Sequence, residues 1–429
     1  MADKMLSDKQ VTDLLATYKK IFIAYSGGID SHVLLHLIVN WQYCKKNIKL
    51  FAVHINHNIS PNSHQWQLHC RRTCYKLGIT YITKTIPRNL TNNISSPEET
   101  LRNLRYKIFA KILPSNACLL TAHQADDQAE TLLLQLFRGT GIKGLAAMPE
   151  KIKFAEGFLV RPLLKQKRED ILCYANRHKL EWIEDESNTD IGLTRNFIRY
   201  KLFPIIRKKW SSIVTTLNRV SLHCAEANEL LSLLGRTDLK KILRQPNIIN
   251  TFLLKKLSII RQKNVLRLWL HQLNLPLPSS AKLSEIIRTV VNSRYDKTPI
   301  VKWSGAEVRR FRHNLYAMTP LSQHDNKVIL FFSKKTLKLP SNLGNLKVKL
   351  TPKTKLRLEK IKVGFRRGGE KIKIPGRIGS HNLKKLMQEW EIPPWLRDRT
   401  PLIYNNKTII AVVGYYSIEG VHFTQSIYH

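Results

Sequence analysis

The sequence predicts an α/β protein in three parts: a doubly wound parallel sheet first, a helical middle domain next, and a small α/β domain last. At 429 residues the chain is long enough for two or three domains. Up to about residue 205, short apolar runs alternate with segments of helical periodicity, which is typical of parallel βαβ units. Helical patterns with polar connections follow, and short apolar strands return near the C-terminus. The expected domains are residues 1–207, 208–325 and 326–429.

Four apolar runs are the expected parallel strands of the first domain: Lys20–Tyr25, Ile48–Ile55, Thr80–Thr85 and Ala117–Ala122. A segment of helical character follows each of them. Because such sheets bind ligands beyond the carboxyl ends of their strands, we expect the functional residues in the loops that follow these runs.

The loop after the first strand has the composition of a phosphate-binding turn. It consists of Ser26, Gly27, Gly28, Ile29, Asp30 and Ser31. Two glycines let backbone N–H groups approach an anion, and the start of the next helix adds favourable partial charge. A carboxylate beside a phosphate is repulsive unless a divalent cation lies between them, so Asp30 indicates a metal–nucleotide complex. The pattern GxxxxGK[ST] is absent, which excludes the common kinase or GTPase loop.

Acidic side chains gather after the fourth strand, where a helix begins with Asp126, Asp127 and Glu130. Capping and the helix dipole explain part of this cluster. Three acids at the same sheet edge as the glycine turn also suggest a site for a cation, either magnesium or a substrate amine. Two further segments offer anion-binding groups: a helix from Pro97 that carries Arg102, and a helix start at Arg195.

The charge of the chain points to a polyanionic partner. Lysine and arginine number 71 against 31 aspartate and glutamate, a net charge of +40, and nucleic acid is the leading explanation. No stretch of 18 apolar residues and no apolar signal core occur, so we expect a cytoplasmic protein with no membrane association. Without any CxxC pattern, the six cysteines are expected to be buried, reduced thiols: Cys44, Cys70, Cys74, Cys118, Cys173 and Cys224.

The densest basic block lies in the last domain, with 15 lysines and arginines against two acids between Lys334 and Arg377. Tryptophans follow among further cations, a composition that suits single-stranded RNA, whose bases stack on aromatic rings while phosphates meet arginine. The residues predicted to contact RNA are Arg366, Arg367, Lys371, Lys384, Lys385, Trp395 and Arg397.

These motifs resemble a known family. SGGxDS resembles the loop of the N-type ATP pyrophosphatases, the PP-loop superfamily with an adenine nucleotide alpha hydrolase-like fold. Over nearly the whole chain the order of motifs is similar to that of the tRNA(Ile)-lysidine synthases: SGGIDS, HINHNIS, EETLRNLRY, TAHQADDQAET, RGTGIKGLAAM, VRPLL, EDESN and TRNFIR. FRRGGEK and IPPWLRDRTPLIY also look like the C-terminal tRNA-binding domain of this family.

The resemblance implies a reaction and roles for residues. ATP would activate the wobble cytidine in the CAU anticodon of tRNA(Ile) as an adenylate, and L-lysine would displace AMP to give lysidine, which changes codon reading from AUG to AUA. By this resemblance Ser26 to Ser31 would hold ATP, Asp30 would bind Mg²⁺, and Arg102 would neutralise phosphate charge. The lysine pocket would consist of His123, Asp127, Glu130 and Arg195, with the two acids meeting ammonium groups and Arg195 meeting the carboxylate. A homodimer is a further expectation.

Other functions use the same loop. A different ATP-dependent tRNA-modifying enzyme of this fold, or a small-molecule amidotransferase, would share the glycine turn, although the second leaves the basic C-terminal block unexplained. A non-catalytic RNA-binding protein would keep RNA binding after Asp30→Ala. Sulfur-transferring tRNA enzymes usually need catalytic or cluster-binding cysteines in CxxC or similar arrangements, which this chain lacks.

Overall fold

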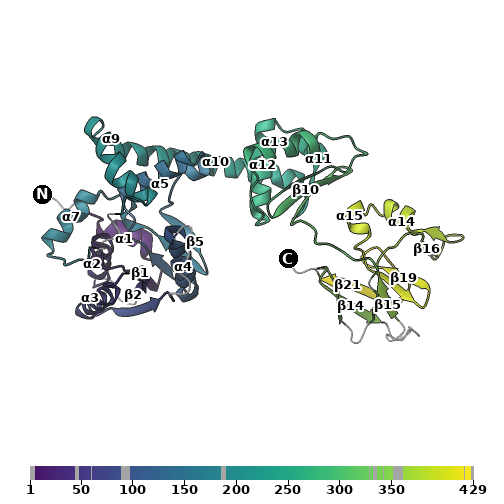
Figure 1. Cartoon of the computed structure of the whole chain (residues 1–429), viewed down its shortest axis with the longest axis horizontal. Coiled ribbons are helices and arrows are strands. Elements are labelled where there is room, and N and C mark those ends of the chain that lie inside the picture. The colour runs from purple at the N-terminus through teal and green to yellow at the C-terminus, as the bar shows by residue number, and fades with distance from the viewer. Residues whose placement is uncertain are drawn as a thin grey trace. The chain divides into compact units, whose positions relative to one another are not determined.

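The computed structural model describes residues 5–43, 48–58, 60–87, 97–184, 190–327, 329–331, 336–341, 343–350, 361–419 and 421–426. The chain divides into two compact units, Met1–Leu231 and Ser232–His429, each with its own elements (Figure 1). The three-part division at residues 207 and 325 stays a prediction.

The first unit is built on a six-stranded sheet in the order β3-β2-β1-β4-β6-β5. All neighbouring strands are parallel except β5, which is antiparallel to β6. Its strands are β1 (Lys20–Ala24), β2 (Lys49–Asn56), β3 (Thr80–Thr85), β4 (Cys118–Leu120), β5 (Lys151–Phe154) and β6 (Gly157–Val160). The four predicted parallel strands are therefore confirmed, the fourth in a shorter form than expected.

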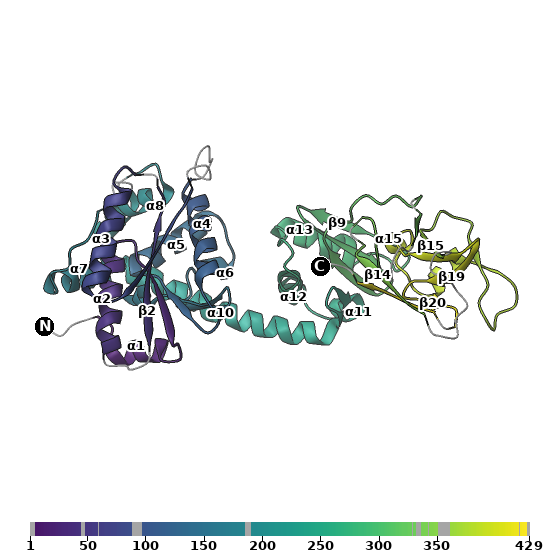
Figure 2. The ribbon, with the colours of Figure 1, turned by 90° about the horizontal axis from the view of Figure 1, so that it is seen from below.

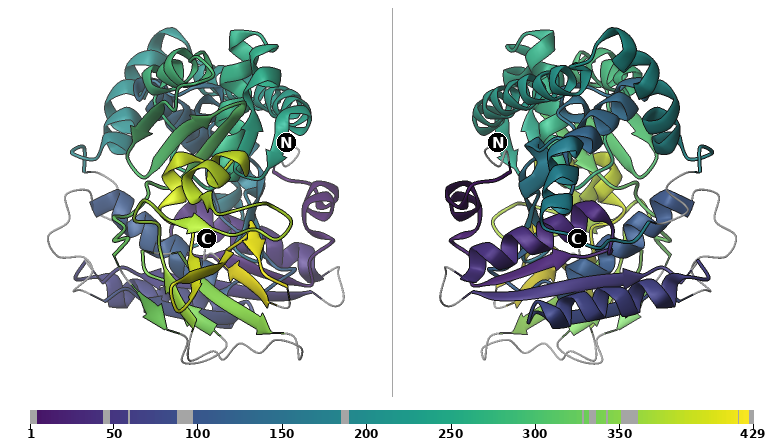
Figure 3. Two further views of the ribbon diagram at one scale, coloured as in Figure 1. Left: turned by 90° about the vertical axis from the view of Figure 1, so that its right-hand side faces the viewer. Right: turned by 90° about the vertical axis from the view of Figure 1, so that its left-hand side faces the viewer.

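Helices cover both faces of this sheet, which makes it doubly wound (Figure 2). The helices are α1 (Asp8–Leu15), α2 (Ile29–Tyr43), α3 (Ser63–Lys76), α4 (Pro97–Ile112), α5 (Ala125–Phe137), α6 (Ile142–Leu145), α7 (Arg168–Arg177), α8 (Thr194–Phe197), α9 (Phe203–Lys209) and α10 (Ile213–Ile242), with a 3₁₀ turn η2 (Pro162–Lys165) and a π-helix η4 (Ile198–Leu202). One core joins α1, α2, α3 and α7 to one face of the strands, and another packs α4 on the opposite face. In the right-hand view of Figure 3, purple helices of the first unit lie over its strands.

Strand β1 lies at the centre of the sheet, and its position decides where the site forms. Ile21 pairs with Leu50 of β2 on one side and with Cys118 of β4 on the other. The chain moves outward from β1 to β3 and then returns to β4, so the strand order reverses between β1 and β4. Ligands of such sheets bind at this reversal, where the loops after β1 and β4 begin.

The second unit begins with helices packed on an antiparallel sheet, and α10 leads into it. The sheet has the order β7-β8-β11-β10-β9, a feature that the helical pattern of the sequence did not reveal. The elements are β7 (Leu243–Gln245), β8 (Ile248–Asn250), α11 (Thr251–Lys255), α12 (Ile259–Gln272), α13 (Ser280–Glu285), the π-helix η5 (Ile286–Val291), β9 (Ile300–Trp303), β10 (Ala306–Phe311) and β11 (Asn314–Met318). Trp269 of α12 and Val290 of η5 are buried in this core.

The last part is a small α/β region with sheets of five, three and two strands. It contains β12 (Leu330–Phe331), β13 (Thr336–Lys338), β14 (Asn345–Leu350), β15 (Ile361–Gly364), β16 (Lys371–Ile372), β17 (His381–Asn382), α14 (Leu383–Glu389), α15 (Pro394–Arg397), β18 (Leu402–Asn405), β19 (Thr408–Val412), β20 (Tyr416–Ser417) and β21 (Val421–Ser426). Its two predicted strands at Leu402–Tyr404 and Ile409–Gly414 correspond to β18 and β19.

The thiol prediction holds for most of the described cysteines. Cys70, Cys74 and Cys118 are buried and free, and Cys224 is half-buried and free. Cys173 is free but exposed, so burial was wrongly predicted there: it lies on the outer side of α7, whose Ile171, Tyr174 and Ala175 face the core. Cys44 lies outside the described residues.

Candidate active site

The loop Ser26–Ser31 joins β1 to α2, and its two serines form hydrogen bonds within the loop. The Ser31 hydroxyl donates to the Gly28 carbonyl oxygen at 2.9 Å and lies 3.1 Å from the Ser26 hydroxyl. Gly27 has a φ of +90°, and a Cβ there would lie 2.6 Å from Cδ1 of Ile183. The Ile183 amide also donates to the Gly27 carbonyl at 2.9 Å. The loop therefore has a fixed shape that only glycine permits at its tightest point.

Asp30 stands in the first turn of α2 with too little positive charge around it. Burial, together with the negative charges of Asp127 and Asp126, raises the pKa of Asp30 to about 6, although Arg168 and Arg199 act in the opposite direction. Its Oδ1 is buried and has no hydrogen-bond partner among the described residues, while Nη1 of Arg168 is 3.6 Å from Oδ2. Such a carboxylate is suited to a cationic ligand.

Asp127 and Glu130 lie one turn apart on α5, across the reversal point from Asp30. Asp127 also caps its own helix, since its Oδ2 accepts from the Gln124 amide at 3.0 Å. Asp126 forms an ion pair with Arg207. The capping interpretation of part of this cluster is thus confirmed.

Two arginines meet the two acids in a group that we call the acid–arginine tetrad, in which Glu130 is buried and the other three side chains are partly exposed: Asp127, Glu130, Arg195 and Arg199. Arg195 Nε donates to Glu130 at 2.8 Å, and Arg199 Nε donates to the other Glu130 oxygen at 2.6 Å. Both Nη2 groups also approach Asp127 Oδ1, at 3.3 and 2.9 Å. Burial would raise the pKa of Asp127, but the charges of Arg195 and Arg199 and the hydrogen bond from the Gln124 amide outweigh burial and lower it.

The remaining predicted residues border the tetrad. His123 follows β4, its Nδ1 lies 3.0 Å from the Thr121 hydroxyl, and burial lowers the pKa of the ring. Arg102 of α4 is half-buried, with its guanidinium carbon 5.3 Å from the centre of the Tyr106 ring. The fold therefore gathers every residue predicted for ATP and lysine along one edge of one sheet.

Sequence reasoning missed three arginines of this region. Arg199 completes the tetrad, Arg168 faces Asp30, and Arg161 is buried at the end of β6. A signal for Arg199 existed, because it follows Arg195 by four residues and a buried pair of acids needs two cations. Arg161 stands within VRPLL, a motif to which no role was given.

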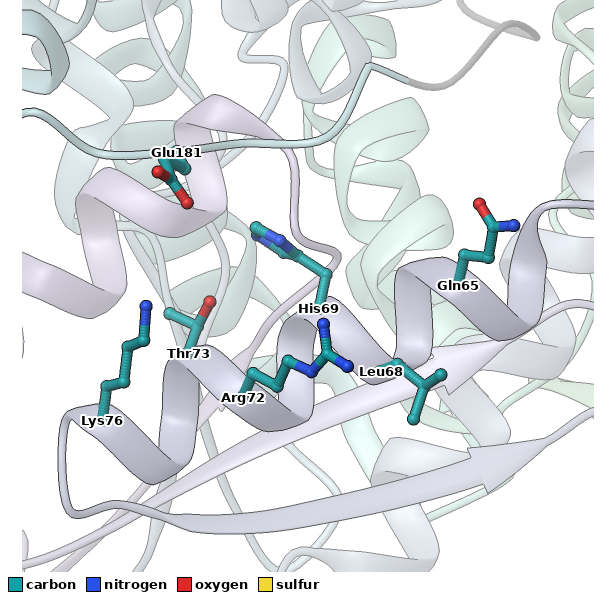
Figure 4. Close-up of a pocket in the computed structure, with 7 residues that line it drawn as sticks. All are labelled: Gln65, Leu68, His69, Arg72, Thr73, Lys76 and Glu181. Carbon is teal, nitrogen blue, oxygen red and sulfur yellow. The ribbon is translucent and has the colours of Figure 1, made fainter.

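A shallow cavity of about 470 Å³ lies over α3 (Figure 4). Six side chains of α3, among them His69, Arg72 and Lys76, line it together with Glu181, and none of the predicted site residues does. Glu181, which lines the cavity, lies two residues before Ile183, whose amide donates to the Gly27 carbonyl. The segment that borders the cavity therefore also contacts the glycine turn.

The predicted RNA-binding residues lie in the second unit in varied surroundings. Lys371, Lys384 and Lys385 are exposed. Arg366 pairs with Asp398 at 2.9 Å, Arg367 donates to backbone carbonyls, and Arg397 donates to the Ile392 carbonyl at 2.9 Å. Trp395 is half-buried, with the Arg309 guanidinium 5.3 Å from its ring centre and Tyr316 and Phe311 at its edges. Their contact with RNA stays a prediction.

The first unit belongs to the class of PP-loop proteins, since residues 3–206 match the family model of the PP-loop domain. Residues 252–316 match the TilS substrate binding domain, and residues 361–426 match the TilS substrate C-terminal domain.

Full-length relatives define the particular family. The tRNA(Ile)-lysidine synthase of Coxiella burnetii is 41% identical over 95% of this chain and 91% of its own length. The enzymes of the same name from Legionella pneumophila (strain Paris) and Salmonella typhi are 39% and 37% identical, over 99% and 94% of this chain and 97% and 94% of their own lengths. The chain belongs to the tRNA(Ile)-lysidine synthase family.

Among the described residues, every helix is too short or too polar to cross a membrane. Cytoplasmic location and a homodimer stay predictions.

Proposed function

We propose that this protein ligates L-lysine to C2 of the wobble cytidine in the CAU anticodon of tRNA(Ile), with ATP as the activating substrate. Family membership supports an ATP-dependent, lysidine-forming tRNA modification. One structural observation supports the roles that we propose for individual residues. Asp30, whose negative charge is incompletely balanced by neighbouring cations, follows a glycine turn and lies opposite the acid–arginine tetrad. A phosphate site and a site for a charged amine can therefore share one sheet edge.

In the first step, the cytosine O2 attacks the α-phosphorus of ATP. A new P–O bond forms, the bond to the bridging oxygen of the β-phosphate breaks, and pyrophosphate leaves. The Ser26–Ser31 loop would hold the phosphates through its N–H groups and hydroxyls, and Arg102 would offset the charge that develops on them.

In the second step, the ε-amine of lysine attacks C2 of the adenylated cytidine. The C2–N bond forms, the C2–O2 bond breaks, AMP leaves with the oxygen, and the amine releases a proton to solvent. Asp127 would meet the ammonium group, because its side chain keeps 13% of its surface exposed whereas Glu130 keeps none. Glu130 would then fix Arg195 and Arg199 in place.

The surroundings of Asp30 fit Mg²⁺. Its Oδ1 is unpartnered among the described residues, and in that part of the chain no three His, Cys, Asp or Glu side chains form a cage. Magnesium is usually held by one or two carboxylates plus substrate phosphates. Asp30 would supply such a ligand, and the ion would add charge neutralisation at the phosphates.

The test is incorporation of radiolabelled lysine into unmodified tRNA together with release of AMP. We expect labelling of tRNA(Ile) with a CAU anticodon, none of the methionine tRNA that shares this anticodon, and loss of labelling in Asp127→Ala. AMP release without lysine transfer would assign a different acceptor to the same loop. The absence of AMP in every mixture would contradict an enzymatic function.

A further inference from the structure

Arg161 is a buried cation that the proposed mechanism does not use. It directly follows β6, only 5% of its surface is exposed, and its backbone amide donates to the Glu150 carbonyl at 2.8 Å. Its Nη1 donates to the Pro149 carbonyl at 2.7 Å, and Tyr106 of α4 accepts a further hydrogen bond. No ion pair joins it to a carboxylate within the described residues. A buried guanidinium without a counter-ion is costly and needs a reason.

A second buried arginine shows how such a group is satisfied when its role is structural. Arg310 is 4% exposed and also lacks a carboxylate partner among the described residues. Its Nε and Nη1 donate to three backbone carbonyls and one hydroxyl at 2.7 to 3.1 Å. Nε of Arg161, in contrast, is buried with no acceptor in the described chain. The side of the guanidinium that binds carboxylates bidentately is therefore incompletely used.

The electrostatic surroundings place Arg161 on the substrate side of the site. Its charge and that of Arg102 act on His123, and burial followed by these charges keeps that ring neutral. The groups that chiefly influence Asp30 are Asp127, Arg168, Arg199 and Asp126, and Arg161 is not one of them. Since β6 is two strands from β1, the ends of these strands are about 10 Å apart. Arg161 thus lies beyond His123 as seen from the phosphate loop.

We propose that Arg161 binds the α-carboxylate of the lysine substrate and so orients its ε-amine toward Asp127 and the phosphate loop. This inference rests on the proposed function and differs from the expectation that Arg195 meets the carboxylate. Arg195 is already engaged with both acids of the tetrad. Lysine binding would displace the half-buried Tyr106 from the guanidinium, and the carboxylate would supply the missing acceptor.

The experiment compares lysine with cadaverine, the same diamine chain without the carboxylate, in the wild-type enzyme and in Arg161→Gln. With full-length protein and unmodified tRNA, pyrophosphate release without amine measures adenylation, and amine incorporation measures the second step. We expect Arg161→Gln to raise the KM for lysine about 10- to 100-fold, to leave the KM for cadaverine unchanged, and to leave adenylation unchanged.

Two control variants separate binding from a structural role. Arg310→Gln removes an equally buried arginine, and the KM for lysine should not change. Tyr106→Phe removes the hydroxyl that occupies Arg161, so the KM for lysine should stay the same or fall. If Tyr106→Phe and Arg161→Gln instead weaken lysine and cadaverine alike, Arg161 only supports the fold. A fall in adenylation would assign it to ATP. If wild-type enzyme incorporates no lysine, the proposed function itself fails.

Discussion

Two carboxylate sites face each other across the strand reversal, and they differ in how their charge is balanced. Asp127 and Glu130 have two arginines within hydrogen-bond distance, and the pKa of Asp127 is lowered. Asp30 has one arginine at 3.6 Å, and its pKa is raised to about 6. Within the tetrad Glu130 is fully buried and paired, and the partly exposed Asp127 can still meet an amine, whereas Asp30 needs a ligand to complete its surroundings. The comparison teaches that acids on one sheet edge can have opposite tasks.

The largest expected effect is that of Asp30→Asn, which should lower the rate of adenylation by at least about 100-fold. The same change should stabilise the ligand-free protein at pH 7 by about 1–2 kcal/mol. A folded pKa above the unfolded value of 3.8 means that Asp30 favours folding below pH 4 and that this contribution disappears as the pH rises through about 6. Pyrophosphate release and thermal unfolding at pH 4 and 7 measure both effects. A variant less stable than wild type at pH 7 would show that Asp30 is already balanced.

Glu130→Gln should destabilise the first unit by about 3 kcal/mol, because two partly buried arginines would then share one acid. Urea unfolding followed by circular dichroism measures the change. The matched control is Glu150→Gln, which breaks an exposed ion pair with Lys165 and should change stability by less than about 0.5 kcal/mol. Equal effects of the two variants would mean that the tetrad is not a structural unit.

Gly27→Ala should cost about 1–3 kcal/mol of stability, since φ of +90° is unfavourable for alanine and its Cβ would meet Ile183 and Cys70. Gly28 has no such strain, and the nearest atom to a Cβ there lies at 3.6 Å. We therefore expect Gly28→Ala to unfold close to the wild-type temperature. Scanning calorimetry compares them, and similar losses would refute a shape requirement specific to Gly27.

The smallest effect is that of Arg168→Met. Arg168 lowers the pKa of Asp30, but its side chain is 46% exposed, so its influence is weak. Removing it should raise the apparent pKa in the pH profile of kcat/KM for ATP by less than about one unit. Arg168→Lys keeps the charge and should leave the profile in place. A shift toward lower pH in Arg168→Met would reverse the assignment.

Much of the site was predictable from local sequence. The glycine turn, Asp30 and the acidic start of α5 were recognisable because turns, caps and helix starts depend on neighbouring residues. The sheet β7-β8-β11-β10-β9 of the second unit was not, since β7 and β8 are three residues each, and β8 joins the sheet by pairing with the distant β11. Short strands of this kind carry too little periodicity to be distinguished from connections.

The sequence by itself determined the parallel strands of the first unit, the glycine turn and the family, because each depends on residue types at short and fixed spacing. Tertiary structure alone decided how the charges are shared. Glu130 and Arg199 are 69 residues apart, and only packing α5 against η4 brings them to 2.6 Å. Likewise, Arg161 comes close to His123 only because β6 pairs with β4. Charge balance in a buried site depends on distances between segments, and no local pattern encodes those distances.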